Sequence, residues 1–262
     1  MRQLAFLVLV LHVVTMAIGQ PKKQVPNMHY FYNSGWLVET GKHLLVFDFI
    51  PDSSSGVSLL KLEQLLKKVI SEKKKIIILV SHDHTDHFDS TIFNLSRISN
   101  DITYIGGWEY KTMPVGVVIK NIKPGDSLIT NDYAVFTHVS SDEGSGMMIK
   151  VDGYVIYHAG DHALWADQLT DMFTRELKSI KSKTDHIDLA FLPAARGLFT
   201  KCAYDSVIEK GLRLSAEILR PRTIALQHVG CADKLWQYMQ AQQALSAIKT
   251  NWIVPVKYDQ AF

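Results

Sequence analysis

The chain has 262 residues, and 47% of them are hydrophobic, which is enough to build a large packed core. Its 28 basic and 26 acidic side chains leave a formal net charge of only +2. A chain so close to neutral gives no support to non-specific binding of nucleic acid or of an anionic membrane surface. No internal repeat or low-complexity linker divides it, so a single α/β domain is expected over residues 20–262.

The first 19 residues are typical of a secretory signal peptide. Arg2 precedes an apolar run over residues 4–14, and the small-residue pattern Ala17-Ile18-Gly19 follows that run. The run is shorter than the roughly 20 residues that a membrane-spanning helix needs, and Pro21 ends it. We therefore predict cleavage after Gly19 and a secreted protein, extracellular or periplasmic, without a membrane attachment.

Two cysteines, Cys202 and Cys231, remain after this cleavage. An oxidising compartment permits a disulfide between them. A disulfide also needs Cα atoms about 5.5 Å apart, and the sequence does not fix that distance. A disulfide and a pair of buried thiols both remain open.

The first half of the remaining chain predicts a β-meander, a helix and a buried strand. Aromatic and β-branched residues over 28–32, 36–39 and 44–50 are separated by turn residues, which indicates three antiparallel strands. Apolar residues recur at helical spacing over 58–73, which predicts an amphipathic helix. The continuous apolar run 76–80 is typical of a strand buried on both faces.

The second half of the chain alternates strands and helices. A short helix is predicted over 90–98. Strands are then predicted near 103 and over 115–120, 134–138, 147–151 and 154–158. Helices over 163–181, 204–219 and 233–248 alternate with strands over 187–192 and 223–227. Mixed sheets with helices on their outer faces predict a layered α/β sandwich.

A histidine-rich segment follows the buried strand directly. It places His82, His84, Asp86 and His87 within six residues, where the chain must turn and side chains can converge on one point. Such nitrogen and oxygen ligands select zinc, or less often iron or manganese. The alternating spacing directs His82 and His84 to one ion, and Asp86 and His87 can reach a second ion.

This motif is similar to the signature of the metallo-β-lactamase superfamily, whose members share a four-layer αββα sandwich and usually hold one or two metal ions. The resemblance implies further ligands at later strand ends. The implied first ion is held by His82, His84 and His138, the implied second ion by Asp86, His87 and His228, and Asp161 bridges the two. Asp142 or a water molecule is the alternative to His138, because a catalytic zinc site tolerates an open position. If His138 is not a ligand, a site with a single metal ion is the other alternative.

The resemblance covers most of the chain after the signal peptide. It is strongest to small bacterial metallo-hydrolases and more distant to the ascorbate-phosphate lactonase branch, and it includes the segments 33–39, 157–161 and 188–193. One departure is His162, which stands where the superfamily often has a threonine after the bridging aspartate.

The predicted function is a metal-dependent hydrolase that cleaves an ester, lactone, amide or phosphoester of a small molecule with a metal-bound hydroxide. Asp86 or Asp161 would orient the hydroxide or accept its proton. A phosphodiesterase or nuclease is one alternative, although a near-neutral chain argues against a large nucleic acid. A metal- or ligand-binding protein without turnover is the other alternative.

Four residues near the predicted ligands keep two interpretations each. Arg196 could bind an anionic group through its planar guanidinium, or it could form a surface ion pair. Trp165 and His162 could line the pocket or belong to the core. His158 could orient a metal ligand, or its ring could be satisfied by the backbone.

Overall fold

A computed structural model of the protein describes residues 24–109, 116–196, 205–229, 241, 243, 245–246 and 248–262. The predicted signal peptide, Cys202, Cys231 and most of the predicted helix 233–248 lie outside these residues. Within the described part of the chain, none of the helices has the length and apolar character needed to cross a membrane.

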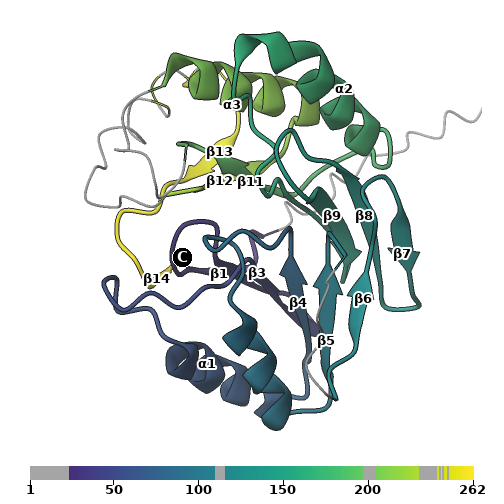
Figure 1. Ribbon diagram of the computed structural model, residues 1–262, viewed down its shortest axis with the longest axis vertical. Coiled ribbons are helices and arrows are strands. Elements are labelled where there is room, and N and C mark those ends of the chain that lie inside the picture. The colour runs from purple at the N-terminus through teal and green to yellow at the C-terminus, as the bar shows by residue number, and fades with distance from the viewer. Residues whose placement is uncertain are drawn as a thin grey trace, which may run out of the picture.

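The described strands form two sheets that face each other (Figure 1). The first sheet has the spatial order β14 (Gln260–Ala261), β1 (Asn27–Tyr30), β2 (Trp36–Glu39), β3 (His43–Phe47), β4 (Lys75–Val80), β5 (Ile102–Gly106) and β6 (Ile119–Asn121). The second has the order β13 (Asn251–Ile253), β12 (Thr223–Gln227), β11 (Leu189–Pro193), β10 (Tyr154–His158), β9 (Ser145–Val151), β8 (Tyr133–Val139) and β7 (Ser127–Ile129).

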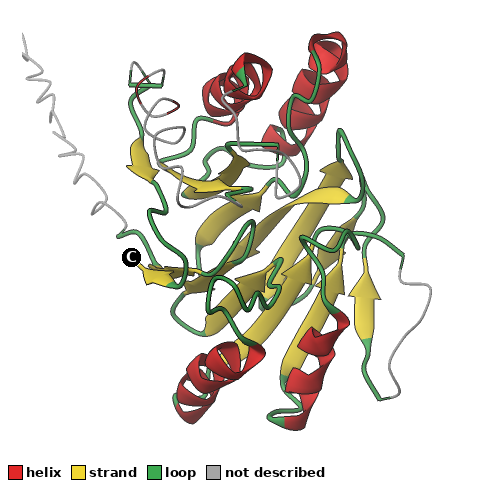
Figure 2. Cartoon of the chain, turned by 60° about the vertical axis from the view of Figure 1, so that its left-hand side comes forward, coloured by secondary structure: helices red, strands yellow, loops and turns green. Residues whose placement is uncertain are grey.

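Helices cover the outer face of each sheet, as Figure 2 shows with the strands between two groups of helices. Helix α1 (Leu59–Ser71) and the 3-10 helix η1 (Ser90–Arg97) pack on the first sheet. The 3-10 helix η2 (Asp167–Leu169) leads into α2 (Thr170–Lys181), which lies with α3 (Ser206–Leu219) on the second sheet. The predicted αββα sandwich is confirmed.

Strand β4 explains why its sequence is apolar without interruption. Successive side chains of a strand point to opposite faces. Ile77 and Leu79 belong to the core between the two sheets, whereas Ile76, Ile78 and Val80 pack under α1 and η1. Both faces of β4 are therefore covered, as the sequence predicts.

The parallel part of each sheet creates the position for a site. Strands β3 to β6 are parallel in the first sheet, and β10 to β13 are parallel in the second. Ligands of open α/β sheets bind beyond the carboxyl ends of parallel strands. The carboxyl ends of β4, β10 and β12 lead directly to His82, Asp161 and His228.

Some element boundaries differ from the predictions. The helix predicted to start at 163 begins at Thr170, because the indole of Trp165 donates to the carbonyl of Asp161 and holds this segment as a turn. The strand predicted over 115–120 is β6, at 119–121. Strands β7, β13 and β14 were not predicted, and each has three residues or fewer, too few to show a strand period.

Candidate metal centre

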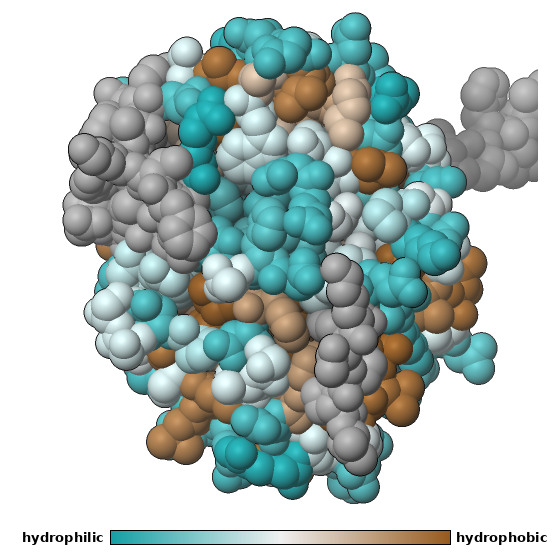
Figure 3. Space-filling view, viewed as in Figure 1, coloured by the Kyte–Doolittle hydropathy of each residue, from teal (hydrophilic) through white to brown (hydrophobic). Residues whose placement is uncertain are grey.

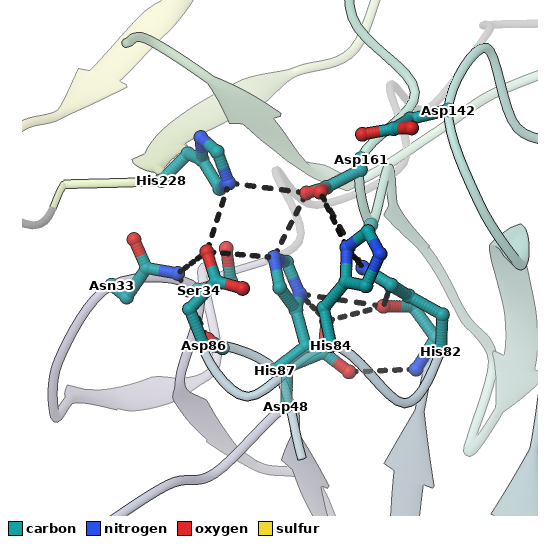
Figure 4. Close-up of polar contacts among 12 residues, drawn as sticks. Asn33, Ser34, Asp48, His82, His84, Asp86, His87, Asp142, Asp161 and His228 are labelled. Carbon is teal, nitrogen blue, oxygen red and sulfur yellow. Dashed lines mark hydrogen bonds and ion pairs between the residues drawn. The ribbon is translucent and has the colours of Figure 1, made fainter. Parts of the chain in front are cut away.

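Three segments that follow strands bring their polar side chains to one point between the two sheets (Figure 4). The loop after β4 supplies the histidine-rich segment, the loop after β10 supplies Asp161, and the residue after β12 is His228. His228 has φ 63°, a left-handed conformation that is uncommon outside glycine. In the space-filling view, hydrophilic residues gather over the region between the sheets (Figure 3).

The first group of potential ligands consists of His82, His84 and Asp161. The Nε2 atom of His82 lies 3.0 Å from Nδ1 of His84. Oδ2 of Asp161 lies 3.4 Å from the same His82 atom and 4.0 Å from the same His84 atom. Three donor atoms so close together could bind one ion.

The second group consists of Asp86, His87 and His228. Oδ2 of Asp86 lies 3.9 Å from Nε2 of His87 and 3.6 Å from Nε2 of His228. The other oxygen of Asp161, Oδ1, faces this group at 2.8 Å from His87 Nε2 and 3.2 Å from His228 Nε2. Asp161 therefore presents one oxygen to each group, which is the arrangement of a bridging carboxylate.

The buried donor atoms of this centre suit a metal ion. Nε2 of His87, Nε2 of His228 and Oδ1 of Asp161 are buried and have no hydrogen-bond partner among the described residues. A buried polar atom without a partner is costly, and few occur in native proteins. Three such atoms directed at one another are explained when an ion lies between them, and imidazole and carboxylate donors fit zinc, iron or manganese.

One buried aspartate, Asp48, sets the proton positions of two histidines. Its Oδ2 accepts from Nδ1 of His87 at 2.7 Å and from the hydroxyl of Ser81 at 2.7 Å, and its Oδ1 accepts from the Ser81 N–H. Because the Ser81 hydroxyl donates to Asp48, its oxygen accepts from Nδ1 of His82, 2.9 Å away. Both imidazoles then keep the lone pair of Nε2 for the metal, as outer hydrogen bonds commonly ensure.

Two further contacts fix the other imidazoles. Nδ1 of His228 donates to the carbonyl of Ala195 at 2.8 Å, which leaves Nε2 free for the metal. His84 is turned the other way, because its Nε2 lies 2.8 Å from Oε2 of Glu143 and its Nδ1 faces the centre.

Mutual charge changes the pKa values of the ligands. Burial acts to lower the pKa of His228, but the nearby negative charges of Asp161 and Asp86 raise it to about 9. Burial acts to raise the pKa of Asp161, but His87 and His228 hold it well below its ordinary value. Without a metal ion, protons on the histidines balance the negative charge of the carboxylates. A metal ion has to displace these protons, so metal affinity should depend on pH.

No protein-family model matches the chain. Among curated proteins, the UPF0173 metal-dependent hydrolase of Bacillus licheniformis is 28% identical over 218 residues, which are 76% of this chain and 83% of the relative. The UPF0173 metal-dependent hydrolase of Pyrobaculum islandicum is 23% identical and covers 87% of this chain and 96% of its own length.

Two solved structures decide the fold. Igni18, a metallo hydrolase of Ignicoccus hospitalis, superposes with a TM-score of 0.62 at 18% identity, over 90% of this chain and 97% of its own. YhfI of Bacillus subtilis, a metallo-β-lactamase fold protein, superposes with a TM-score of 0.54 at 16% identity, over 90% of this chain and 99% of its own. The chain has the metallo-β-lactamase fold. The predicted resemblance is confirmed at this level, and the curated relatives support a metal-dependent hydrolase.

The metallo-β-lactamase fold hosts other chemistry as well. CmlA of Streptomyces venezuelae, a diiron β-hydroxylase, superposes with a TM-score of 0.61 at 9% identity, over 93% of this chain and 55% of its own. The fold alone therefore selects neither the metal nor the reaction, which must be argued from the site.

His138 is not brought to the centre, contrary to the expectation from the sequence. Its Nε2 lies 2.8 Å from the Tyr157 hydroxyl and its Nδ1 lies 2.9 Å from the carbonyl of Val139, so both ring nitrogens are used within the protein. The ring lies over Gly146, where a Cβ would approach His138 Nε2 to 2.1 Å. Burial lowers the pKa of His138 to about 4. The first group is left with two histidines and Asp161.

The structure resolves two of the open interpretations and adds residues that the sequence did not reveal. Nε2 of His158 lies 3.1 Å from the Ser34 carbonyl, and its Nδ1 accepts from the Gly160 N–H, so His158 is a core histidine satisfied by the backbone. His162 lies in the core against Phe173. Asp48 and Glu143 were missed; a lone aspartate between Phe47 and Phe49 was the only available signal for Asp48.

An open pocket of about 540 Å³ lies over the centre. Its size is within the range of small-molecule sites. It is lined by Asp83, His84, Thr85, Asp86, Asp142, Asp161, Trp165, Arg196 and His228. Trp165 and Arg196 therefore belong to the pocket, and Asp142 lies beside Asp161 at its rim (Figure 4).

We expect Glu143→Gln to weaken metal binding at the first group selectively. The carboxylate of Glu143 holds His84, but both side chains are about half exposed, at 57% and 41%, so water and salt screen the contact. We expect a loss of less than about tenfold in metal affinity, below the 10- to 100-fold typical of buried partners. Competition titration against a chelator measures it, with Glu72→Gln at a distant ion pair as the control. Unchanged affinity would show that Glu143 does not hold His84 in solution.

Proposed function

We propose that this chain is a metal-dependent hydrolase of small molecules that cleaves an ester, lactone, amide or phosphoester, with zinc as the first candidate ion. The observation that carries the proposal is the placement of Asp161, which directs one oxygen at His82 and His84 and the other at His87 and His228. The names of the curated relatives support the metal-dependent hydrolase, and the substrate class is our own inference.

The ligand set would be divided between two ions. His82 and His84 would hold one ion, Asp86, His87 and His228 would hold the other, and Asp161 would bridge them. Bound metal ions supply a strong nucleophile from water near neutral pH and polarise the oxygen of the group under attack.

Asp86 and Asp161 are the carboxylates placed to move a proton. Both line the pocket, and Oδ2 of Asp86 lies 3.6 Å from His228 Nε2. Asn33 donates to the backbone carbonyl of Asp86 at 2.9 Å and holds its loop in place. A general base has to lie within hydrogen-bond reach of the proton that it takes, and both carboxylates line the pocket in which that proton would lie.

The first group is open because His138 is absent from it. Two histidines and one carboxylate oxygen leave room for water or substrate, as catalytic zinc sites require. The two remaining groups of ligands beside an open pocket favour turnover over a protein that only binds metal, and the size of the pocket favours a small substrate over a nucleic acid.

The proposal is tested by turnover of the metal-loaded chain. The full mature protein with zinc is assayed against a lactone, an aryl ester, a phosphodiester and a β-lactam, before and after removal of metal by a chelator. We expect turnover of at least one class, loss of turnover with the chelator and recovery when zinc, manganese or iron is restored. Turnover that survives complete metal removal would overturn the proposal.

We also propose that the protein acts after export, on the basis of the pattern in residues 1–19. Expression of the full chain in a cell with a secretory pathway should yield a mature protein whose N-terminus is Gln20. Retention of the intact N-terminus inside the cell would contradict the export.

A further inference from the structure

One side of the pocket differs in charge from the rest. Among the described residues that line it, Arg196 is the only lysine or arginine, whereas Asp83 and Asp142 add carboxylates beyond the metal ligands. An anionic group that entered elsewhere on the wall would meet these carboxylates. The side of Arg196 is therefore where an anion away from the ions is best accommodated.

The guanidinium of Arg196 is held in place from two directions. Its Nε donates to Oδ2 of Asp205, and its Nη2 donates to the carbonyl of Trp165 at 2.8 Å. Asp205 is itself fixed, because its Oδ1 caps α3 by accepting from the N–H groups of Val207 and Ile208. The head of Arg196 is consequently oriented before any ligand arrives, which reduces the entropy lost on binding.

Contacts with the described residues leave some donors of the guanidinium unused. An arginine has five N–H donors, and contacts within the described residues use two of them. The side chain is 34% exposed and lines the pocket, so its remaining donors can be reached by a ligand. A planar fork of N–H groups matches the two oxygens of a carboxylate or phosphate.

Trp165 links this arginine to the metal ligands. Its indole N–H donates to the carbonyl of Asp161 at 3.0 Å, and its ring lies 5.7 Å from the ring of His228. Trp165 therefore contacts Arg196 through its carbonyl, Asp161 through its indole N–H and His228 of the second group through its ring. A ligand held by Arg196 would lie beside the ring of Trp165 and extend toward the ions.

We propose that Arg196 is a specificity-determining residue that binds an anionic group, a carboxylate or a phosphate, of a substrate whose scissile bond lies at the metal centre. The proposal rests on the proposed hydrolase function, and it names the class of substrate. The competing account is that Arg196 only joins the end of β11 to the start of α3 through its ion pair with Asp205.

Two matched esters separate these accounts. The zinc-loaded mature protein is assayed with mono-4-nitrophenyl succinate and with 4-nitrophenyl 4-methylpentanoate, in which an isopropyl group replaces the carboxylate. We expect the wild type to prefer the anionic ester and Arg196→Gln to reduce that preference about 10- to 100-fold through KM, the range for hydrogen bonds to charged groups. Arg175→Gln, at the exposed pair with Glu176, should keep the preference.

A binding measurement keeps this test independent of turnover. Titration calorimetry with succinate and with inorganic phosphate should show at least one anion binding to Arg196→Gln about tenfold more weakly than to Arg175→Gln, and the anion affected distinguishes a carboxylate from a phosphate. If neither these esters nor any substrate of the four-member panel is cleaved but this difference remains, the hydrolase function fails and the anion site stands.

The opposite results overturn the proposal. If the wild type and Arg196→Gln bind both anions with equal affinity, the proposal is wrong. It is also wrong if Arg196→Gln loses turnover of both esters equally and has a lower melting temperature. If Arg196→Gln does not fold, Arg196→Lys replaces it, since lysine keeps the charge beside Asp205 but lacks the planar fork. An undiminished preference for the anionic ester in that variant would also contradict the proposal.

Discussion

We expect Asp161→Ala to lose both metal ions and nearly all turnover. The carboxylate provides an oxygen to each ligand group, at 2.8 Å and 3.2 Å from the histidines of the second group and at 3.4 Å and 4.0 Å from those of the first. Its removal leaves four imidazoles around the centre with Asp86 as the remaining carboxylate. Because metal ions contribute several kcal/mol to transition-state stabilisation, turnover should fall by about a thousandfold or more.

The measurement is metal content per chain together with turnover of whichever substrate the wild type cleaves. Asp167→Asn is the control, since this aspartate is exposed and pairs with Lys210 away from the centre. It should keep both metal content and turnover. An Asp161→Ala protein that retained a full complement of metal would show that Asp161 does not bridge the two groups.

The second large effect is expected for Asp48→Asn. The variant keeps the size of the side chain but presents an amide NH₂ where the carboxylate accepted two hydrogen bonds. If the amide oxygen accepts from the Ser81 N–H, the NH₂ group donates to Nδ1 of His87, and the proton of His87 moves to Nε2. A protonated Nε2 cannot bind a metal.

The same exchange disturbs His82 through Ser81. The Ser81 hydroxyl can no longer donate to residue 48, so its oxygen is not reserved for Nδ1 of His82. Metal affinity should fall about 10- to 100-fold, as for other residues that orient metal-binding histidines. Turnover at low metal concentration should fall in parallel and recover in part when excess metal is added.

The control for Asp48→Asn is a second buried aspartate that is remote from the centre. Asp188 accepts from the Val155 N–H at 2.9 Å and from Arg222 at 3.0 Å, at the amino ends of β10 and β11. Asp188→Asn should lower the melting temperature without changing metal affinity. If both variants change metal affinity equally, the effect is loss of stability and Asp48 has no specific role in proton placement.

The sequence predicts the parts of the centre that follow strands in the parallel regions. The apolar run of β4 and the histidines after it are adjacent in the chain, so their joint position requires no knowledge of the fold. Asp161 and His228 follow β10 and β12, whose carboxyl ends meet at the same edge of the second sheet. The spatial convergence of these side chains agrees with the prediction.

His138 shows why the remainder was not predictable. It lies near the end of β8 in the antiparallel part of the second sheet, opposite Gly146 in β9. Because Gly146 has no side chain, the imidazole crosses β9 and reaches Tyr157 in β10. The register of β8 on β9 decides this contact, and the sequence pattern does not show which residue of β9 lies opposite His138.

Asp48 and Glu143 illustrate a second limit. Each contacts a candidate metal ligand across a long stretch of chain, Asp48 contacting His87 and Glu143 contacting His84. A lone acidic residue in a loop has no spacing that marks it as a partner of a histidine. Contacts of this kind become visible only when tertiary structure places the two side chains together.

We propose that this chain builds a two-metal centre around Asp161. Its most direct test is the number of ions bound per chain by the wild type, measured by elemental analysis after equilibration with zinc and removal of free metal. We predict two ions per chain, both lost on treatment with a chelator. A folded chain that binds one zinc ion or none under these conditions would contradict a two-metal centre.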